Sequence, residues 1–151
     1  MKYATDTIID LPREKVISLF DNTKNLFNWQ EGLKSFDHIE GEPGQEGARS
    51  RLVYESRKGD LEITETITRR NLPDEFHGVY ESKGVYNEIY NYFIETAPDQ
   101  TTWETVSIFR FRGLMAVMAP IMKSVFISTT LLNMERFKVF AEQTNNQPEK
   151  E

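Results

Sequence analysis

The chain has 151 residues, of which 38% are hydrophobic and 28% charged, and its formal net charge is −6. This size and composition fit one globular domain with a single core and exclude a disordered chain. The absence of cysteine excludes disulfides, cysteine-ligated zinc and thiol catalysis. The negative charge argues against nucleic acid or an anionic membrane surface as the main partner, although a local basic patch would not show in this average.

The first ten residues, MKYATDTIID, lack the apolar core and the small-residue cleavage site of a signal peptide. We therefore expect a cytoplasmic protein. Residues 1–143 are expected to form one domain, and the polar segment 144–151 is expected to be a disordered tail.

Residues 2–9 alternate and contain Tyr, Thr and Ile, which predicts a first strand. Pro12 and Glu14 then suit the first turn of a helix, because proline fits the first helical position and the helix dipole favours an acid there. A second short helix over 24–30 is expected to bury Trp29. From Gly32 onward the pattern changes to strands that are separated by short turns.

The short connections, such as Lys58-Gly59 and Lys83-Gly84, predict antiparallel pairing of these strands. With the first strand they give seven in all: 2–9, 33–40, 48–57, 60–70, 75–82, 85–96 and 101–112. The loop 41–47 holds three glycines and a proline, which is typical of a turn region.

The segment 114–142 is the most apolar part of the chain, and its first 21 residues carry a single charge, Lys123. It is long enough to span a bilayer, which takes about 20 residues. Lys123, Pro120, the polar run 128–130 and Asn133 argue against a span, since a central lysine costs about 2.5–3.5 kcal/mol on insertion. We interpret the segment as an amphipathic helix over the sheet, with no stable membrane insertion.

A helical wheel divides this segment into two apolar surfaces. The side expected to face the sheet consists of Leu114, Met115, Met118, Ile121, Met122, Val125, Thr129, Leu132, Val139 and Phe140, with Phe126 at its edge. Ile127, Leu131 and Met134 form a smaller outer stripe. This stripe is either a partner or dimer contact or an ordinary scatter of exposed apolar residues, so a monomer and a homodimer both remain open.

Strand alternation predicts which side chains face the helix, although both faces of 85–96 are mixed; there Tyr86, Tyr90 and Tyr92 are expected inward. An apolar pocket with few polar anchors is typical of small-molecule sites. The expected ligand-binding residues are Leu52, Tyr54, Ile63, Tyr80, Tyr90, Trp103, Ser107, Phe109, Met118, Met122, Val125 and Thr129. The pattern alone favours a dry core over a cavity.

Glu65 is the most distinctive inward residue, because it is a carboxylate between Ile63 and Ile67. Burial would raise its pKa and make it a candidate proton acceptor or ligand anchor, and an ion pair with Arg136 is the alternative. The two histidines, His38 and His77, are expected at the surface and lack metal-ligand spacing. No metal, no cofactor and no nucleophile triad is expected.

The element order gives an α+β helix-grip arrangement: a seven-stranded antiparallel sheet wrapped around a long C-terminal helix, with two short helices after the first strand. Residues 9–21 resemble the opening of the START-like (SRPBCC) superfamily, with Pro12 before Glu-x-Val and then Asp21. Further parts of its pattern are matched by Trp29, by Gly44 and Gly47, and by the passage Arg112-Gly113-Leu114. The resemblance covers residues 3–140 and departs at Leu11, where a small residue is more common.

This resemblance favours a cavity and implies binding or transport of a small hydrophobic ligand, lipid-, polyketide- or quinone-like, between the sheet and the C-terminal helix. A polyketide cyclase/dehydratase-like enzyme with Glu65 as general base is one alternative. A protein-interaction module similar to chaperone activators is the other. Because no catalytic set matches residue by residue, the sequence leaves open whether the chain is an enzyme.

Overall fold

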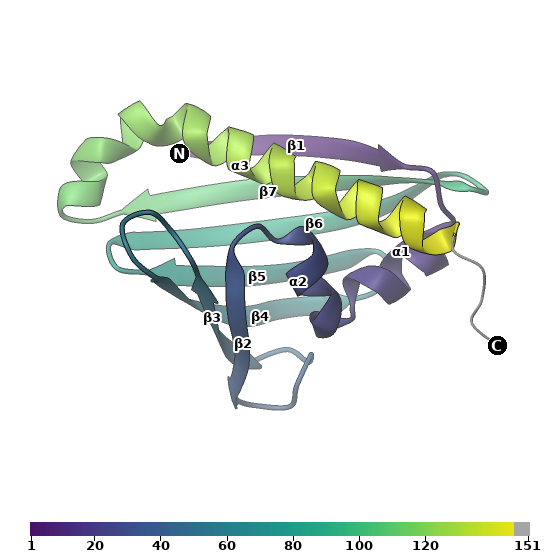
Figure 1. Ribbon diagram of the computed structural model, residues 1–151, viewed down its shortest axis with the longest axis horizontal. Helices are drawn as coiled ribbons and strands as arrows, with labels where there is room; N and C mark the ends of the chain where they lie inside the picture. The colour runs from purple at the N-terminus through teal and green to yellow at the C-terminus, as the bar shows by residue number, and fades with distance from the viewer. Residues whose placement is uncertain (147–151) are drawn as a thin grey trace.

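An antiparallel sheet of seven strands curves around the long C-terminal helix α3 in the computed structural model, which describes residues 1–146 (Figure 1). The strand order is β1-β7-β6-β5-β4-β3-β2. The strands are β1 Lys2–Ile9, β2 Leu33–Glu40, β3 Arg49–Tyr54, β4 Leu61–Asn71, β5 Glu75–Ser82, β6 Val85–Ala97 and β7 Gln100–Phe111. The helices are α1 Arg13–Phe20, the 3-10 turn η1 Thr23–Asn25, α2 Leu26–Trp29 and α3 Leu114–Asn145. The predicted helix-grip fold is confirmed.

The short helices after β1 begin at residues that favour a helix start. Pro12 occupies the N-cap position of α1, Glu14 lies in the first turn, and Val16 is the buried residue of this helix. The side chain of Asn22 accepts a hydrogen bond from the backbone N–H of Lys24 at 3.1 Å, which caps η1. Trp29 at the end of α2 is 4% exposed, so this short helix closes onto the core.

The turn between β5 and β6 needs its glycine because it lies against the start of α3. Gly84 has φ +78, and a Cβ there would lie 3.0 Å from the carbonyl oxygen of Arg112 and 3.2 Å from Cγ of Met115. A side chain would therefore strain the backbone and push α3 away from the sheet. At the far edge of the sheet, β2 pairs with β3 through two register shifts, between Leu33 and Ser35 and between His38 and Glu40.

Phe137 of α3 is fully buried at the centre of an aromatic core. Its ring lies 5.2 Å from Trp29, 5.3 Å from Trp103 and 5.9 Å from Phe20, each in an edge-to-face arrangement. Such contacts stabilise beyond the apolar area that they bury. The aromatic core, which also includes Phe93, ties α3 to β6 and β7 and to the short helices.

The face of α3 that meets the sheet differs from the predicted one. The residues that contact or pack against the rest of the protein include Met115, Ala119, Phe126, Thr130, Met134, Arg136, Phe137, Phe140 and Ala141, of which Met115, Phe126 and Phe140 were predicted to do so. Met134, predicted on an outer stripe, is 2% exposed, whereas Leu114 and Ile121, predicted inward, are 77% and 74% exposed. Because apolar residues surround most of the circumference of 114–134, periodicity alone does not select the buried side.

α3 extends past the expected boundary at residue 143 and ends at Asn145. Residues 147–151 of the expected tail lie outside the described residues. By length and composition α3 is apolar enough to cross a membrane, with mean hydropathy 1.6 over its most apolar 18-residue window and only 6% of that window buried.

We predict that Phe137→Ala lowers the free energy of unfolding by about 3–5 kcal/mol, because it leaves a cavity among four aromatic rings. Val139→Ala is the matched control on the same helix. Val139 is 43% exposed, so its truncation should cost less than about 0.5 kcal/mol. Urea denaturation measures both, and equal losses would contradict the packing described for α3.

Candidate functional site

Five neighbouring strands place one residue each in a row across the concave face of the sheet, the face toward α3. Strand register aligns Ser50, Glu65, Tyr80, Asn87 and Phe109, one from each of β3 to β7. Directly opposed residues of antiparallel strands point to the same side, so these side chains lie next to one another. We call this set the polar row.

A second row, which we call the small-residue row, runs beside the polar row. Register aligns Ile67, Gly78, Ile89, Ser107 and Tyr3. Gly78 and Ser107 flank Ile89 on either side. The Tyr80 ring lies over Gly78, since a Cβ there would be 3.1 Å from Cε2 of Tyr80.

Glu65 lies in the polar row with its carboxyl group crowded by protein atoms. The Tyr80 O–H donates a hydrogen bond to Glu65 Oε2 at 2.8 Å. Burial raises the pKa of Glu65, and the hydrogen bond from Tyr80 offsets part of that rise. The ion pair with Arg136 does not form, since Arg136 Nε donates to the backbone oxygen of Trp29 at 3.0 Å.

Two tyrosines enclose Glu65 and stay protonated at neutral pH. Burial, and next the charge of Glu65, raises the pKa of Tyr80 well above its ordinary value and also raises that of Tyr54. Tyr54 donates its hydroxyl hydrogen to Oε1 of Gln30. The cluster therefore presents hydroxyl groups and one carboxyl group whose proton is held more tightly than usual.

Asn87 brings a polar atom without a protein partner to the same face. Its Oδ1 is buried and accepts no hydrogen bond from the described residues, and the same holds for Oγ1 of Thr105 on β7. Buried polar atoms are nearly always paired, so an unpaired one needs a reason, such as a ligand or water that supplies the donor. Asn87 is adjacent to Tyr80 and Phe109 in register.

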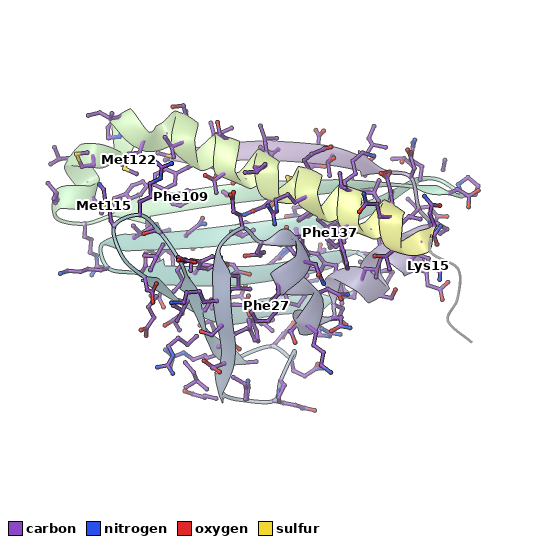
Figure 2. The ribbon with its side chains drawn as sticks, viewed as in Figure 1. Lys15, Phe27, Phe109, Met115, Met122 and Phe137 are labelled. Atoms are coloured by element: carbon purple, nitrogen blue, oxygen red, sulfur yellow. The ribbon has the colours of Figure 1, made fainter. Side chains whose placement is uncertain are left out.

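The concave face is divided into a filled half and an accessible half. Phe93 and Trp103 belong to the aromatic core and are at most 4% exposed. Toward the start of α3 the side chains keep partial exposure instead: Tyr54, Ile63, Glu65, Tyr80, Asn87 and Ile89. Phe126 of α3 stacks on Phe109 at 4.9 Å and bounds this half, and Figure 2 shows Met115 and Met122 at the same end of the molecule as Phe109.

Most residues that the sequence assigned to a ligand site lie on the concave face. These are Leu52, Tyr54, Ile63, Glu65, Tyr80, Trp103, Ser107 and Phe109, with Met122 on α3 nearby. Trp103 is enclosed in the aromatic core and offers no free surface. Met118, Val125 and Thr129 lie elsewhere: Met118 and Val125 are 38% and 54% exposed. Val125 and Thr129 line a shallow groove of about 270 Å³ on α3, where the Thr129 hydroxyl donates to the carbonyl of Val125 at 2.9 Å.

Tyr90 faces the opposite side of the sheet from the site, as do Tyr86 and Tyr92. Phe93 pairs with Trp103 in register, and this pairing sets the phase of β6 so that Asn87 and Ile89 face inward. The sequence offers this signal, because Phe93 and Trp103 are both large and apolar. The prediction that Tyr86, Tyr90 and Tyr92 face inward was therefore wrong. It left out Asn87 and Ile89, the two residues of β6 that belong to the site.

His77 lies on the outer face, as alternation predicted, but it is 6% exposed rather than a surface residue. Tyr90 and Tyr92 cover its ring at 4.9 and 5.1 Å, and its Nδ1 accepts a hydrogen bond from the backbone N–H of Asn91 at 3.2 Å. Its Nε2 lies 3.6 Å from Glu75, which also pairs with Arg69. Within residues 1–146, no three His, Asp or Glu side chains gather as metal ligands.

No protein-family model matches this chain. No curated protein matches it either. Solved structures match over almost the whole length, at identities that show the fold alone. A START superfamily protein from Mycobacterium smegmatis has a TM-score of 0.80 at 12% identity, covering 95% of this chain and 98% of the other.

Two further structures carry names that describe an activity. The Zhui aromatase/cyclase from Streptomyces sp. R1128 has a TM-score of 0.79 at 9% identity, covering 95% of this chain and 94% of that one. Norcoclaurine synthase from Thalictrum has a TM-score of 0.70 at 6% identity, covering 97% and 96%. The chain therefore has the START-like helix-grip fold that its sequence resembles.

We predict that Glu65→Gln changes how stability depends on pH. The folded-state pKa of Glu65 is above its ordinary 4.5. The wild type therefore loses stability as pH rises from about 4.5 toward the folded-state pKa, because only the unfolded state ionises freely there. Glutamine still accepts the Tyr80 hydrogen bond but does not ionise. The free energy of unfolding of Glu65→Gln, relative to that of the wild type, should therefore increase between pH 4.5 and the folded-state pKa of Glu65 and stay constant above it.

Urea denaturation of both proteins over a pH series measures this difference. Glu62→Gln on the exposed side of the same strand is the control, and its difference from the wild type should stay flat. An unchanged pH dependence in Glu65→Gln would show that the carboxyl group is solvated in the folded protein.

Proposed function

We propose that this START-like helix-grip protein binds a small, uncharged, largely apolar molecule on the concave face, against the polar row and beneath the first half of α3. The observation that carries this proposal is the unpaired Asn87 Oδ1 beside the Glu65–Tyr80 hydrogen bond. These polar groups lie among Ile63, Ile89 and Phe109. Such sparse, directed polar groups within apolar surroundings are typical of small-molecule sites.

The hydrogen-bonding groups of the site indicate the polar end of the ligand. Asn87 Oδ1 accepts a hydrogen bond, so it suits a hydroxyl or amide donor on the ligand. When Glu65 is protonated, the oxygen not used by Tyr80 donates a hydrogen bond to a carbonyl or hydroxyl oxygen. A ligand with a phenol, hydroxyl or ketone group on an apolar body satisfies both residues.

The charges around the site favour an uncharged ligand. Neither the polar row nor the small-residue row contains a lysine or arginine. Arg70, on the same strand as Glu65, is held by Asp21 at 2.6 Å and also donates to the Gly44 carbonyl. An anionic ligand would find no counter-charge in either row and would be repelled by an ionised Glu65.

We predict that Ile89→Trp reduces binding of an apolar fluorescent dye at least about tenfold, because the bulkier indole would occupy the part of the concave face where the ligand is proposed to bind. Ile108→Trp is the matched control: Ile108 is also partly exposed but lies on the opposite face of β7. Dye titration measures both variants, and native mass spectrometry of the freshly purified protein tests for a retained ligand. Equal dye binding by the wild type and Ile89→Trp would contradict the proposed location.

A second candidate function is catalysis on the same face, by a cyclase or dehydratase that uses Glu65 as an acid or base. The raised pKa of Glu65 favours it, because a carboxyl group with a pKa nearer neutrality can both accept and return a proton. The single hydrogen of the Tyr80 hydroxyl is donated to Glu65, so this tyrosine holds the carboxyl group in position.

Turnover of polyketide-like substrates by the wild type and by Glu65→Gln separates the two functions. If Glu65 is the catalytic base, we expect a loss of kcat of about 10²–10⁴-fold with retained binding, as for removal of a general base. Retained turnover in Glu65→Gln would exclude this residue from the reaction and leave the binding function in place.

A further inference from the structure

The first half of α3 carries a long apolar surface that the rest of the protein leaves uncovered. Its members are highly exposed for apolar residues, and Leu114, Val117 and Ile121 reach 77%, 70% and 74%. We call this set the free apolar face: Leu114, Val117, Met118, Ile121, Val125 and Leu132. Single exposed apolar residues are ordinary, but a contiguous set on one helix marks an interaction site.

Helical spacing shows that these side chains share one side of α3. Counted from Leu114, the other members lie 3, 4, 7, 11 and 18 residues further on, which places them on one side of α3 over about 27 Å of helix. A different side of α3 contacts the sheet: Phe126 stacks on Phe109, and the hydroxyl groups of Tyr3 and Thr130 form a hydrogen bond of 2.8 Å. The stripe is thus a surface in addition to the helix–sheet contact.

The charges beside the free apolar face are mainly positive. From residue 105 to residue 134 the chain contains Arg110, Arg112 and Lys123 and no acidic residue, although the whole chain has a net charge of −6. Arg112 lies just before α3, whereas Lys123 lies nine residues after Leu114 and so on the opposite side of the helix from the stripe. Glu81 is the acidic residue nearest in sequence to the β5–β6 turn. Lys83 adds a cation in the β5–β6 turn, where Gly84 meets both Arg112 and Met115. Lys83 and Arg112 are exposed, and neither forms an ion pair within residues 1–146.

We propose that the free apolar face docks α3 in the plane of a lipid bilayer with anionic headgroups. Amphipathic helices that lie in the interface bury their apolar side at the headgroup boundary and gain from basic residues beside it. Figure 1 shows this half of α3 at the end of the molecule where β7 leads into the helix, near the β5–β6 turn, so Lys83 and Arg112 lie beside the apolar stripe.

The helix lies in the bilayer plane and does not cross it. The second half of α3 is held by Met134, Phe137 and Ala141, all at most 2% exposed, so it is not free to leave the sheet. Pro120 and the run Ser128-Thr129-Thr130 also make the segment a poor span. This surface contact is independent of ligand binding on the concave face and does not require it.

The charges favour a bilayer over a second copy of this chain. In a twofold contact between two free apolar faces, the segment 105–134 of one copy would meet the same segment of the other, with Arg112 and Lys83 of each copy beside the contact. The segment 105–134 supplies no carboxylate to pair with them. Like charges beside such a contact weaken association, whereas lipid phosphates neutralise both residues.

The test is co-sedimentation of the full chain with vesicles, of phosphatidylglycerol with phosphatidylcholine or of phosphatidylcholine alone. We expect binding to the mixed vesicles that weakens at high salt, and little to phosphatidylcholine. The double substitution Val117→Glu/Ile121→Glu should lower partitioning about tenfold or more, since both side chains leave the bilayer and two negative charges are added. Lys83→Gln and Arg112→Gln should each lower it about fivefold.

Ile94→Glu is the matched control, because Ile94 is 43% exposed on the outer face of β6, at the end of that strand away from the β5–β6 turn. It should bind like the wild type, and circular dichroism should show all variants folded. Absence of binding to the mixed vesicles, equal binding to phosphatidylcholine, or equal loss in Ile94→Glu would each overturn the proposal. A dimer that Val117→Glu/Ile121→Glu dissociates, without vesicle binding by the wild type, would assign the face to a second copy and overturn it too.

Discussion

The contact of Phe137 with the rings of Phe20, Trp29 and Trp103 determines how the rest of the molecule is arranged. It fixes the rotation of α3 about its own axis at the C-terminal end. Because a helix transmits its rotation along its length, the same contact directs Phe126 onto the sheet and Ile121 to solvent. The aromatic core also fills one half of the concave face, where the indole N–H of Trp103 donates to Asn91 Oδ1 at 3.0 Å, and the polar row lies in the other half.

The strands were predictable because alternation with short turns is a strong local signal, and their order confirms the fold that the sequence resembles. Glu65, Tyr80 and Phe109 were placed correctly on the concave face for the same reason. The orientation of β6 and the buried side of α3 could not be predicted from the sequence. Both faces of β6 carry large side chains, so only its pairing with Trp103 decides which of them face inward. The first half of α3 is apolar nearly all round, so only the aromatic core decides which side of the helix meets the sheet.

The two surfaces of α3 differ in the chemistry that each can recognise. Toward the sheet, methionine and phenylalanine side chains adjoin hydroxyl, amide and carboxyl groups, and such a surface suits an uncharged molecule with one polar end. Away from the sheet, aliphatic side chains adjoin cations, and such a surface suits an extended anionic layer. Since the two surfaces share one helix, the ligand proposed for the concave face would lie close to the bilayer proposed for the other.

The register shifts in β2 have a consequence for how copies of this protein behave toward one another. An open sheet ends in strands whose backbone groups can pair with another chain, and a regular edge invites that pairing. β2 interrupts its ladder in two places and exposes Lys34, Asp37 and Glu40. These features make the β2 edge a poor template for strand addition, which limits aggregation through that edge in a protein whose helix keeps an uncovered apolar face.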